Sequence, residues 1–131
     1  MLLDTSGLLC YFDRGDSRND EAVRLVSSAP VLLTHNYVLA EFVPLCHVRR
    51  LNRVRSLGFL ARLQDNPRVT IVWVDQSLHH TALAFLRARP DKTYSLCDAV
   101  SFILMRRQGI TEALTTDEHF DQEGFARLLK P

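Results

Sequence analysis

Four acidic residues of this chain stand among apolar neighbours: Asp4, Glu41, Asp98 and Asp117. An isolated buried carboxylate is costly and tends to take up a proton, and several together repel one another unless a cation joins them. Oxygen ligands of this kind are those that Mg²⁺ and Mn²⁺ prefer. If the fold brings these four acids together, the sequence therefore predicts a site for a divalent cation.

Each acid also has a purely structural interpretation. Asp98 follows Ser95 by three residues, as the second member of a helix capping box does. Asp4 and Asp117 could cap the turns that follow them, and Glu41 could face solvent on a kinked helix. Their joint placement favours a site, because Asp4 and Asp117 come at the ends of predicted strands and the other two lie near helix starts.

The elements that must position these acids alternate between short apolar strands and amphipathic helices. Such alternation predicts an α/β fold with a mostly parallel central sheet covered by helices on both faces, a three-layer α/β/α arrangement. We expect an uninterrupted apolar strand, buried on both faces, at 69–74, and a helix at 36–51 in which Pro44 introduces a kink or break. The other expected strands are 1–3, 31–33, 112–115 and, as an edge strand, 125–129; the other expected helices begin near Thr5, Ser17, Val54, Asp75 and Ser95.

The length and composition indicate one soluble domain spanning residues 1–131, with a net charge of +1 that says nothing about partners. The distribution of charge says more, because Arg49, Arg50, Arg53 and Arg55 form a basic cluster. Arg is suited to forked recognition of phosphate. The alternative is a solvated helical face with no ligand.

The three cysteines, Cys10, Cys46 and Cys97, form no C-x-x-C pair. We interpret them as buried free thiols in a reducing cytoplasm. Neither a signal peptide nor an apolar run of the roughly 18 residues that a membrane span requires is visible.

Four segments together resemble the PIN-domain family, and within it the VapC-like toxins of bacterial toxin–antitoxin pairs. They are Leu2-Leu3-Asp4-Thr5-Ser6, then Leu39-Ala40-Glu41, then Ser95-Leu96-Cys97-Asp98-Ala99 with the apolar helix that follows, and Leu114-Thr115-Thr116-Asp117-Glu118-His119-Phe120. Each segment alone is weak, but their order and spacing are specific, and the resemblance covers nearly the whole chain.

The resemblance implies a Mg²⁺- or Mn²⁺-dependent endoribonuclease. Asp4, Asp98 and Asp117 would be the strongest metal ligands, Glu41 would bind the metal through water or orient the attacking water, and Thr115 would support the site. Asp121 is a further acid that we do not expect to be essential, and His119 is a candidate neighbour of the site. The implied partners are RNA, a small antitoxin protein and a second copy of the chain in a homodimer.

Other interpretations explain less of the chain. Asp4-Thr5-Ser6-Gly7 matches the aspartic-protease signature, but that fold is nearly all β and this chain is rich in helix. A phosphoryl-accepting aspartate would need a second Asp at position 6, which is Ser. The histidines lack zinc-ligand spacing. A PIN-type nuclease that processes RNA without an antitoxin, and a non-enzymatic α/β interaction module, remain as alternatives.

Overall fold

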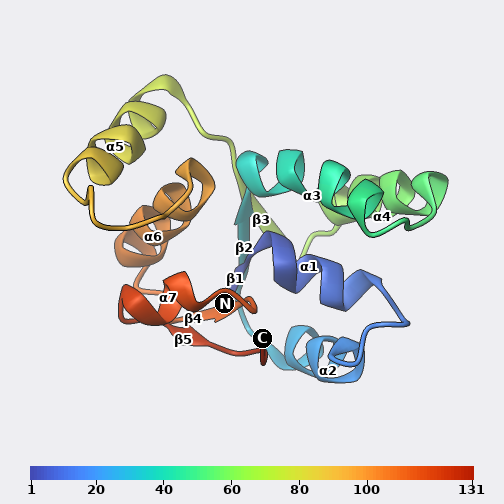
Figure 1. Ribbon diagram of the computed structural model, residues 1–131. Helices are drawn as coiled ribbons and strands as arrows, with labels where there is room; N and C mark the ends of the chain where they lie inside the picture. The colour runs from blue at the N-terminus through green and yellow to red at the C-terminus, as the bar shows by residue number, and fades with distance from the viewer.

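The computed structural model describes residues 1–131 and contains one five-stranded sheet in which every strand pairing is parallel. The strand order is β3-β2-β1-β4-β5, so the first strand lies at the centre of the sheet (Figure 1). The strands are β1 (Leu2–Leu3), β2 (Leu32–His35), β3 (Val69–Val72), β4 (Glu112–Leu114) and β5 (Ala126–Arg127).

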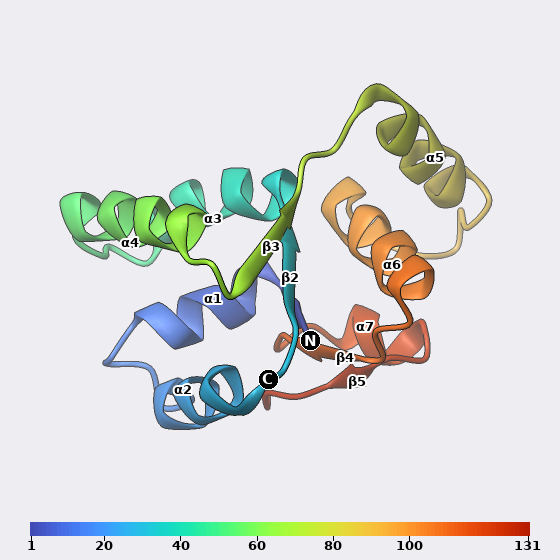
Figure 2. The same cartoon turned by 180° about the vertical axis from the view of Figure 1, so that it is seen from behind.

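Helices cover both faces of the sheet, which confirms the predicted three-layer α/β/α class. One group, α1 to α4, lies on one face and α5 to α7 lie on the other, as the two opposite views in Figures 1 and 2 show. The helices are α1 (Thr5–Phe12), α2 (Asn19–Ser28), α3 (Asn36–Val48), α4 (Arg53–Asp65), α5 (Gln76–Arg87), α6 (Leu96–Gln108) and α7 (Glu118–Gln122). None of them combines the length and apolar character of a membrane-spanning helix.

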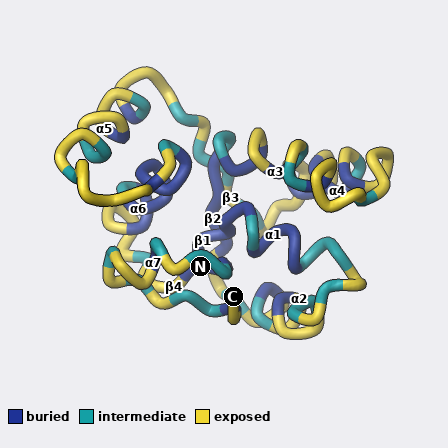
Figure 3. The backbone as a smooth tube through the Cα atoms, viewed as in Figure 1, coloured by how far each residue is buried: buried dark blue, intermediate teal, exposed yellow.

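The alternation of side chains along each strand builds two separate cores. Leu3 and Leu32 pack with the helices of the α1–α4 layer, whereas their neighbours Leu2 and Leu33 pack with the opposite layer. This follows from the two-residue period of a strand, in which successive side chains point to opposite faces. The central strands are therefore buried on both faces, as the dark blue segments of Figure 3 show.

Local signals explain several helix boundaries, and the starts of α5 and α6 lie where they were predicted. The Asp75 side chain accepts a hydrogen bond from the Leu78 N–H at the start of α5, and Ser95 caps α6. Gly109 ends α6 in the left-handed conformation, with a φ of 67°. Asn52 caps α4, although the sequence placed that helix to begin at Val54.

The prediction of a fully buried strand at 69–74 is wrong. The strand spans Val69–Val72, lies at one edge of the sheet and is only partly buried, and Trp73 beyond it is 62% exposed. The strand is partly exposed because it pairs only with β2, so its other edge has no neighbouring strand. An apolar run in the sequence does not indicate whether a strand lies at the edge of the sheet.

Helices α2 and α3 also differ from expectation. Pro44 does not break α3, which continues to Val48 and stops before the predicted Leu51. Pro44 removes only the backbone hydrogen bond to the carbonyl of Ala40. Ala40 and Pro44 are both exposed, so water can donate a hydrogen bond to that carbonyl instead. Helix α2 begins at Asn19 after Arg18, and Ser17 does not cap it.

Candidate active site

One cleft of about 600 Å³ lies where the central strands end, and all four predicted acids line it. They reach it from four different elements: the end of β1, helix α3, the first turn of α6 and the turn before α7. The carboxyl ends of parallel strands are the usual ligand-binding edge of an open α/β sheet. No lysine or arginine is among the residues that line the cleft.

Asp4 is the most buried of the four acids, and a hydrogen bond from Thr115 holds it in place. The Thr115 hydroxyl donates to Asp4 Oδ2 at 2.7 Å and accepts from the Asp117 N–H at 3.0 Å. Ser6 lies between the two segments, with its Oγ 3.1 Å from Thr115 Oγ1, and it accepts from the Thr116 N–H. Thr115 does not line the cleft itself; it connects the end of β4 to the acid that follows β1.

Asp98 has both of the roles that the sequence left open. Its Oδ2 accepts from the Ser95 N–H at 3.0 Å while its own N–H donates to Ser95 Oγ at 3.0 Å, so the capping box is complete. The same carboxylate lines the cleft. Because the capping bond uses only one lone pair of Oδ2, it fixes the orientation of the carboxylate and leaves its remaining lone pairs for a ligand.

Asp117 and His119 form the part of the site nearest to α7. Asp117 Oδ1 accepts from the His119 N–H at 2.9 Å, which caps the short helix. The His119 ring turns back over the acids, so that its Nδ1 lies 3.0 Å from Asp98 Oδ2 and 3.4 Å from Asp117 Oδ2. His119 thus connects two of the predicted acids.

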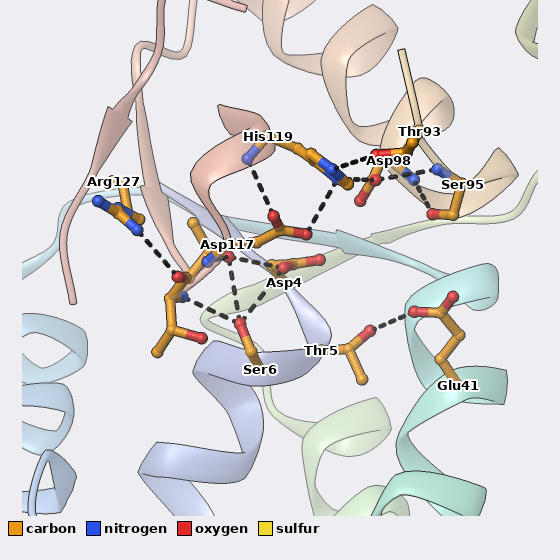
Figure 4. A network of polar contacts seen from close by, with 12 residues as sticks. Asp4, Thr5, Ser6, Glu41, Thr93, Ser95, Asp98, Asp117, His119 and Arg127 are labelled. Atoms are coloured by element: carbon orange, nitrogen blue, oxygen red, sulfur yellow. Dashed lines mark hydrogen bonds and ion pairs between the residues drawn. The ribbon is translucent and has the colours of Figure 1, made fainter. Parts of the chain in front are cut away.

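Glu41 stands apart from the other three acids, beside the start of α1 (Figure 4). Its Oε1 accepts from the Thr5 hydroxyl at 2.9 Å. Glu41 is exposed, in keeping with the solvent-facing alternative, but it faces the same cleft as the other acids.

The electrostatics of the cleft disfavour several charged acids at once. Burial raises the pKa of Asp4 to about 7; the Thr115 hydrogen bond opposes this shift, and the nearby charges of Asp98 and Asp117 add to it. Burial also raises the pKa of Asp98, against the hydrogen bonds from Ser95 and His119. The pKa values of two carboxylates are thus raised in a cleft that lysine and arginine do not line, and a divalent cation would offset the unfavourable negative charge there.

The donor set fits such a cation. One ligand atom each from Asp98, Asp117 and His119 lies within 4.8 Å of the other two. Asp4 is close enough to Asp98 and Asp117 for their charges to affect its pKa. Carboxylate oxygens dominate this set, as hard divalent cations require.

The supporting residues were mostly missed by sequence reasoning. Nothing in the sequence singled out Thr5, Ser6 or Thr93 as partners of the site, because each acts through a residue distant in the chain. His119 was expected only as a neighbour. Asp121 lies outside the cleft and pairs with Arg127 at 2.9 Å.

Two aromatic residues near the cleft, Tyr94 and Phe120, are not available to stack on RNA bases. Phe120 is fully buried and Tyr94 is 8% exposed, so neither ring presents a face to a ligand. Both rings pack against Phe102 in the core between the sheet and α6.

A three-layer parallel α/β fold with acids gathered at the carboxyl ends of its central strands defines the class of a metal-dependent nuclease domain. The chain belongs to the PIN-domain family, whose family model matches residues 1–125. The 23S rRNA-specific endonuclease VapC20 of Mycobacterium tuberculosis, from strains CDC 1551 / Oshkosh and H37Rv, is 34% identical over 129 residues, which cover 98% of this chain and 97% of the relative.

The structural comparison agrees with the sequence comparison. The crystal structure of M. tuberculosis VapC20, described as a sarcin–ricin loop cleaving toxin, matches with a TM-score of 0.86 and 32% sequence identity. The match covers 99% of this chain and 98% of that chain. The chain is therefore a VapC-like PIN-domain ribonuclease, and the alternative of a non-enzymatic module is set aside.

Proposed function

We propose that this chain is a toxin that cleaves RNA by hydrolysis at a Mg²⁺ or Mn²⁺ site built from Asp4, Asp98, Asp117 and Glu41. The observation that carries the proposal is the convergence of these four acids in one cleft that no lysine or arginine lines. Family membership supports the dependence on a divalent metal.

The roles follow from burial and position. Asp4, Asp98 and Asp117 would hold the cation, and Thr115 would position Asp4 through its hydrogen bond. A bound divalent ion lowers the pKa of a bound water and offsets charge on the phosphate oxygens. Glu41, exposed and fixed at one oxygen by Thr5, is placed to accept a proton from the attacking water or to orient it.

The proposed substrate is the sarcin–ricin loop of 23S rRNA. The support is the similarity to VapC20, which extends over nearly the full length of both chains. We further propose a cognate small antitoxin, a homodimer and a cytoplasmic location. The last is consistent with three free, buried cysteines, which a reducing compartment keeps as thiols.

Arg49, Arg50, Arg53 and Arg55 are proposed to bind the RNA backbone outside the cleft. All four are exposed and none takes part in an ion pair. By contrast, Arg68 has a structural role, because it donates to the carbonyls of Val26 and Ala29 at the end of α2.

The test is cleavage of ribosomal RNA in intact ribosomes, with the cut mapped by primer extension. We expect a single cut in the sarcin–ricin loop with Mn²⁺ or Mg²⁺, none with EDTA, and a loss of at least about 100-fold in rate for Asp98→Asn and Asp117→Asn. Asp121→Asn is the matched control and should cleave as the unaltered protein does. Unchanged cleavage in both site variants would disprove the site.

The antitoxin is tested separately in cells. Expression of the chain should arrest growth, and co-expression of the neighbouring reading frame should relieve the arrest. A nuclease that processes RNA without an antitoxin would cleave RNA in the first test but show no such relief.

A further inference from the structure

The His119 imidazole lies beside two of the proposed metal ligands. It lines the cleft, and its Nδ1 faces oxygens of both Asp98 and Asp117, at 3.0 and 3.4 Å. Two donors bound side by side on a six-coordinate ion at about 2.1 Å lie roughly 3 Å apart. The spacing around Nδ1 is therefore that of atoms that could share one cation.

The remaining contacts of His119 fix the ring from the other side. Nε2 lies 3.1 Å from Thr93 Oγ1, and the ring packs edge-on against Tyr94, with ring centroids 5.1 Å apart. A metal-binding histidine usually donates its second ring N–H to an oxygen, which sets the tautomer. If Nε2–H donates to Thr93, the lone pair of Nδ1 points at the two acids.

Tyr94 is in turn held by a partly buried acid. Its hydroxyl donates to Glu123 Oε2 at 2.9 Å, and Glu123 also pairs with Arg106 at 2.9 Å and with Arg89 at 3.6 Å. The segment that carries Thr93 is therefore tied to α6 and to the end of α7. The orientation of the imidazole is built into the fold and does not depend on one contact.

We propose that His119 Nδ1 is a direct ligand of the catalytic cation, beside Asp98 and Asp117, and that this nitrogen favours Mn²⁺ over Mg²⁺. The inference rests on the proposed function, because it concerns the same site. Mg²⁺ binds almost only oxygen, whereas imidazole nitrogen suits first-row transition metals better. The competing interpretation is that Nδ1–H only donates hydrogen bonds to the two acids and gives way when metal binds.

The decisive measurement is the electron spin-echo modulation of Mn²⁺ bound to the intact protein. A directly bound imidazole gives a ¹⁴N coupling, which should change to the ¹⁵N pattern when histidine is isotopically labelled. This measurement needs no substitution, so it does not depend on whether a variant folds. Absence of any nitrogen coupling in a protein that binds Mn²⁺ would overturn the inference.

Calorimetric titrations supply the second readout. We expect His119→Ala to weaken Mn²⁺ binding by about 10-fold or more and to change Mg²⁺ binding much less, and Thr93→Val to weaken Mn²⁺ binding by a smaller factor. His80→Ala, an exposed histidine on α5, is the matched control and should bind both ions unchanged. Equal loss of both ions in His119→Ala would contradict the predicted preference.

The outcomes separate this inference from the proposed function. If Mn²⁺ binds, depends on Asp98 and Asp117, and shows no nitrogen coupling, only the role of His119 fails. If neither Mn²⁺ nor Mg²⁺ binds to the unaltered protein, the metal site fails and the inference fails with it.

Discussion

The proposed role of Asp4 as a metal ligand carries a cost to the stability of the fold. The carboxyl group is almost fully buried, and burial raises its pKa to about 7 even though Thr115 donates a hydrogen bond to it. The pKa in the unfolded chain is about 3.8, so the folded state binds the proton more tightly between these values. The contribution of Asp4 to stability is therefore lost as the pH rises through this window.

Replacing Asp4 by Asn should accordingly stabilise the metal-free protein at pH 8 while abolishing cleavage. Asn keeps an acceptor for Thr115 but carries no charge. We expect the melting temperature at pH 8 to rise by on the order of 5 °C, and the gain to disappear below about pH 3, where Asp4 is protonated in both states. Thermal unfolding in EDTA across this pH range measures the effect.

The effect of Mn²⁺ on the melting temperature tests the same account of Asp4 in the opposite direction. Mn²⁺ should raise the melting temperature of the unaltered protein at pH 8, because it binds the folded state and offsets the crowded carboxylates. It should do so much less for Asp4→Asn. If Asp4→Asn proves less stable than the unaltered protein at pH 8 without metal, the unfavourable charge of Asp4 is not what limits stability there.

The residue scale also shows what sequence can and cannot predict about a site. The four acids were identifiable because each is a charge among apolar neighbours. Burying such a charge costs free energy unless the charge is paired or binds a metal. Thr5, Ser6 and Thr93 are ordinary polar residues in the sequence. Their partners lie 36, 109 and 26 positions away in the chain, so only the fold reveals their roles.

At the scale of elements, the placement of α1 depends on the close approach of Gly7 to β4. A Cβ atom at Gly7 would lie 1.8 Å from the carbonyl oxygen of Leu114, far inside any allowed contact. The Cβ position is fixed by the backbone of α1 and the oxygen belongs to the backbone of β4, so no side-chain rotation relieves the clash. Helix α1 also carries Thr5 and Ser6, so the same approach sets the geometry of the site.

Gly7→Ala should therefore destabilise the fold by roughly 2 kcal/mol or more and reduce RNA cleavage in whatever fraction remains folded. Urea unfolding followed by circular dichroism measures the first effect. Gly58→Ala is the matched control: Gly58 is inside α4, and its added Cβ would meet only the mobile end of Arg62, at 3.3 Å. There we expect a gain of about 0.5–1 kcal/mol. Equal stabilities for the two variants would contradict the close packing of α1 on β4.

The elements themselves were predictable where the signal is local. The capping residues Asp75 and Ser95 act within a few positions, and both helix starts were correctly predicted. The burial of β3 was predicted wrongly, because an apolar run does not reveal whether its strand is central or at an edge of the sheet. The central place of β1, on which the site depends, likewise became visible only from the strand order.

At the scale of the whole molecule, the cleft and the basic cluster occupy different parts of the same helical layer. Helix α3 lines the cleft with Glu41 and Val48, and the chain then turns through Arg49 and Arg50 into α4 (Figure 1). Because the net charge is only +1, any attraction for RNA must come from such local accumulation. An RNA strand that leaves the cleft along α3 would reach these arginines.

Substituting Gln for Arg49, Arg50, Arg53 and Arg55 together should weaken RNA binding and flatten its salt dependence. If all four contact phosphate, the slope of log affinity against log salt should decrease by about 2 to 3. Fluorescence anisotropy with a labelled sarcin–ricin loop RNA, in an Asp98→Asn background that does not cleave, measures both quantities. Replacing Arg24 and Arg87, two exposed arginines on α2 and α5, is the control for general charge loss. A slope that falls as much per arginine removed in the control as in the cluster variant would show that RNA responds to overall charge and not to this surface.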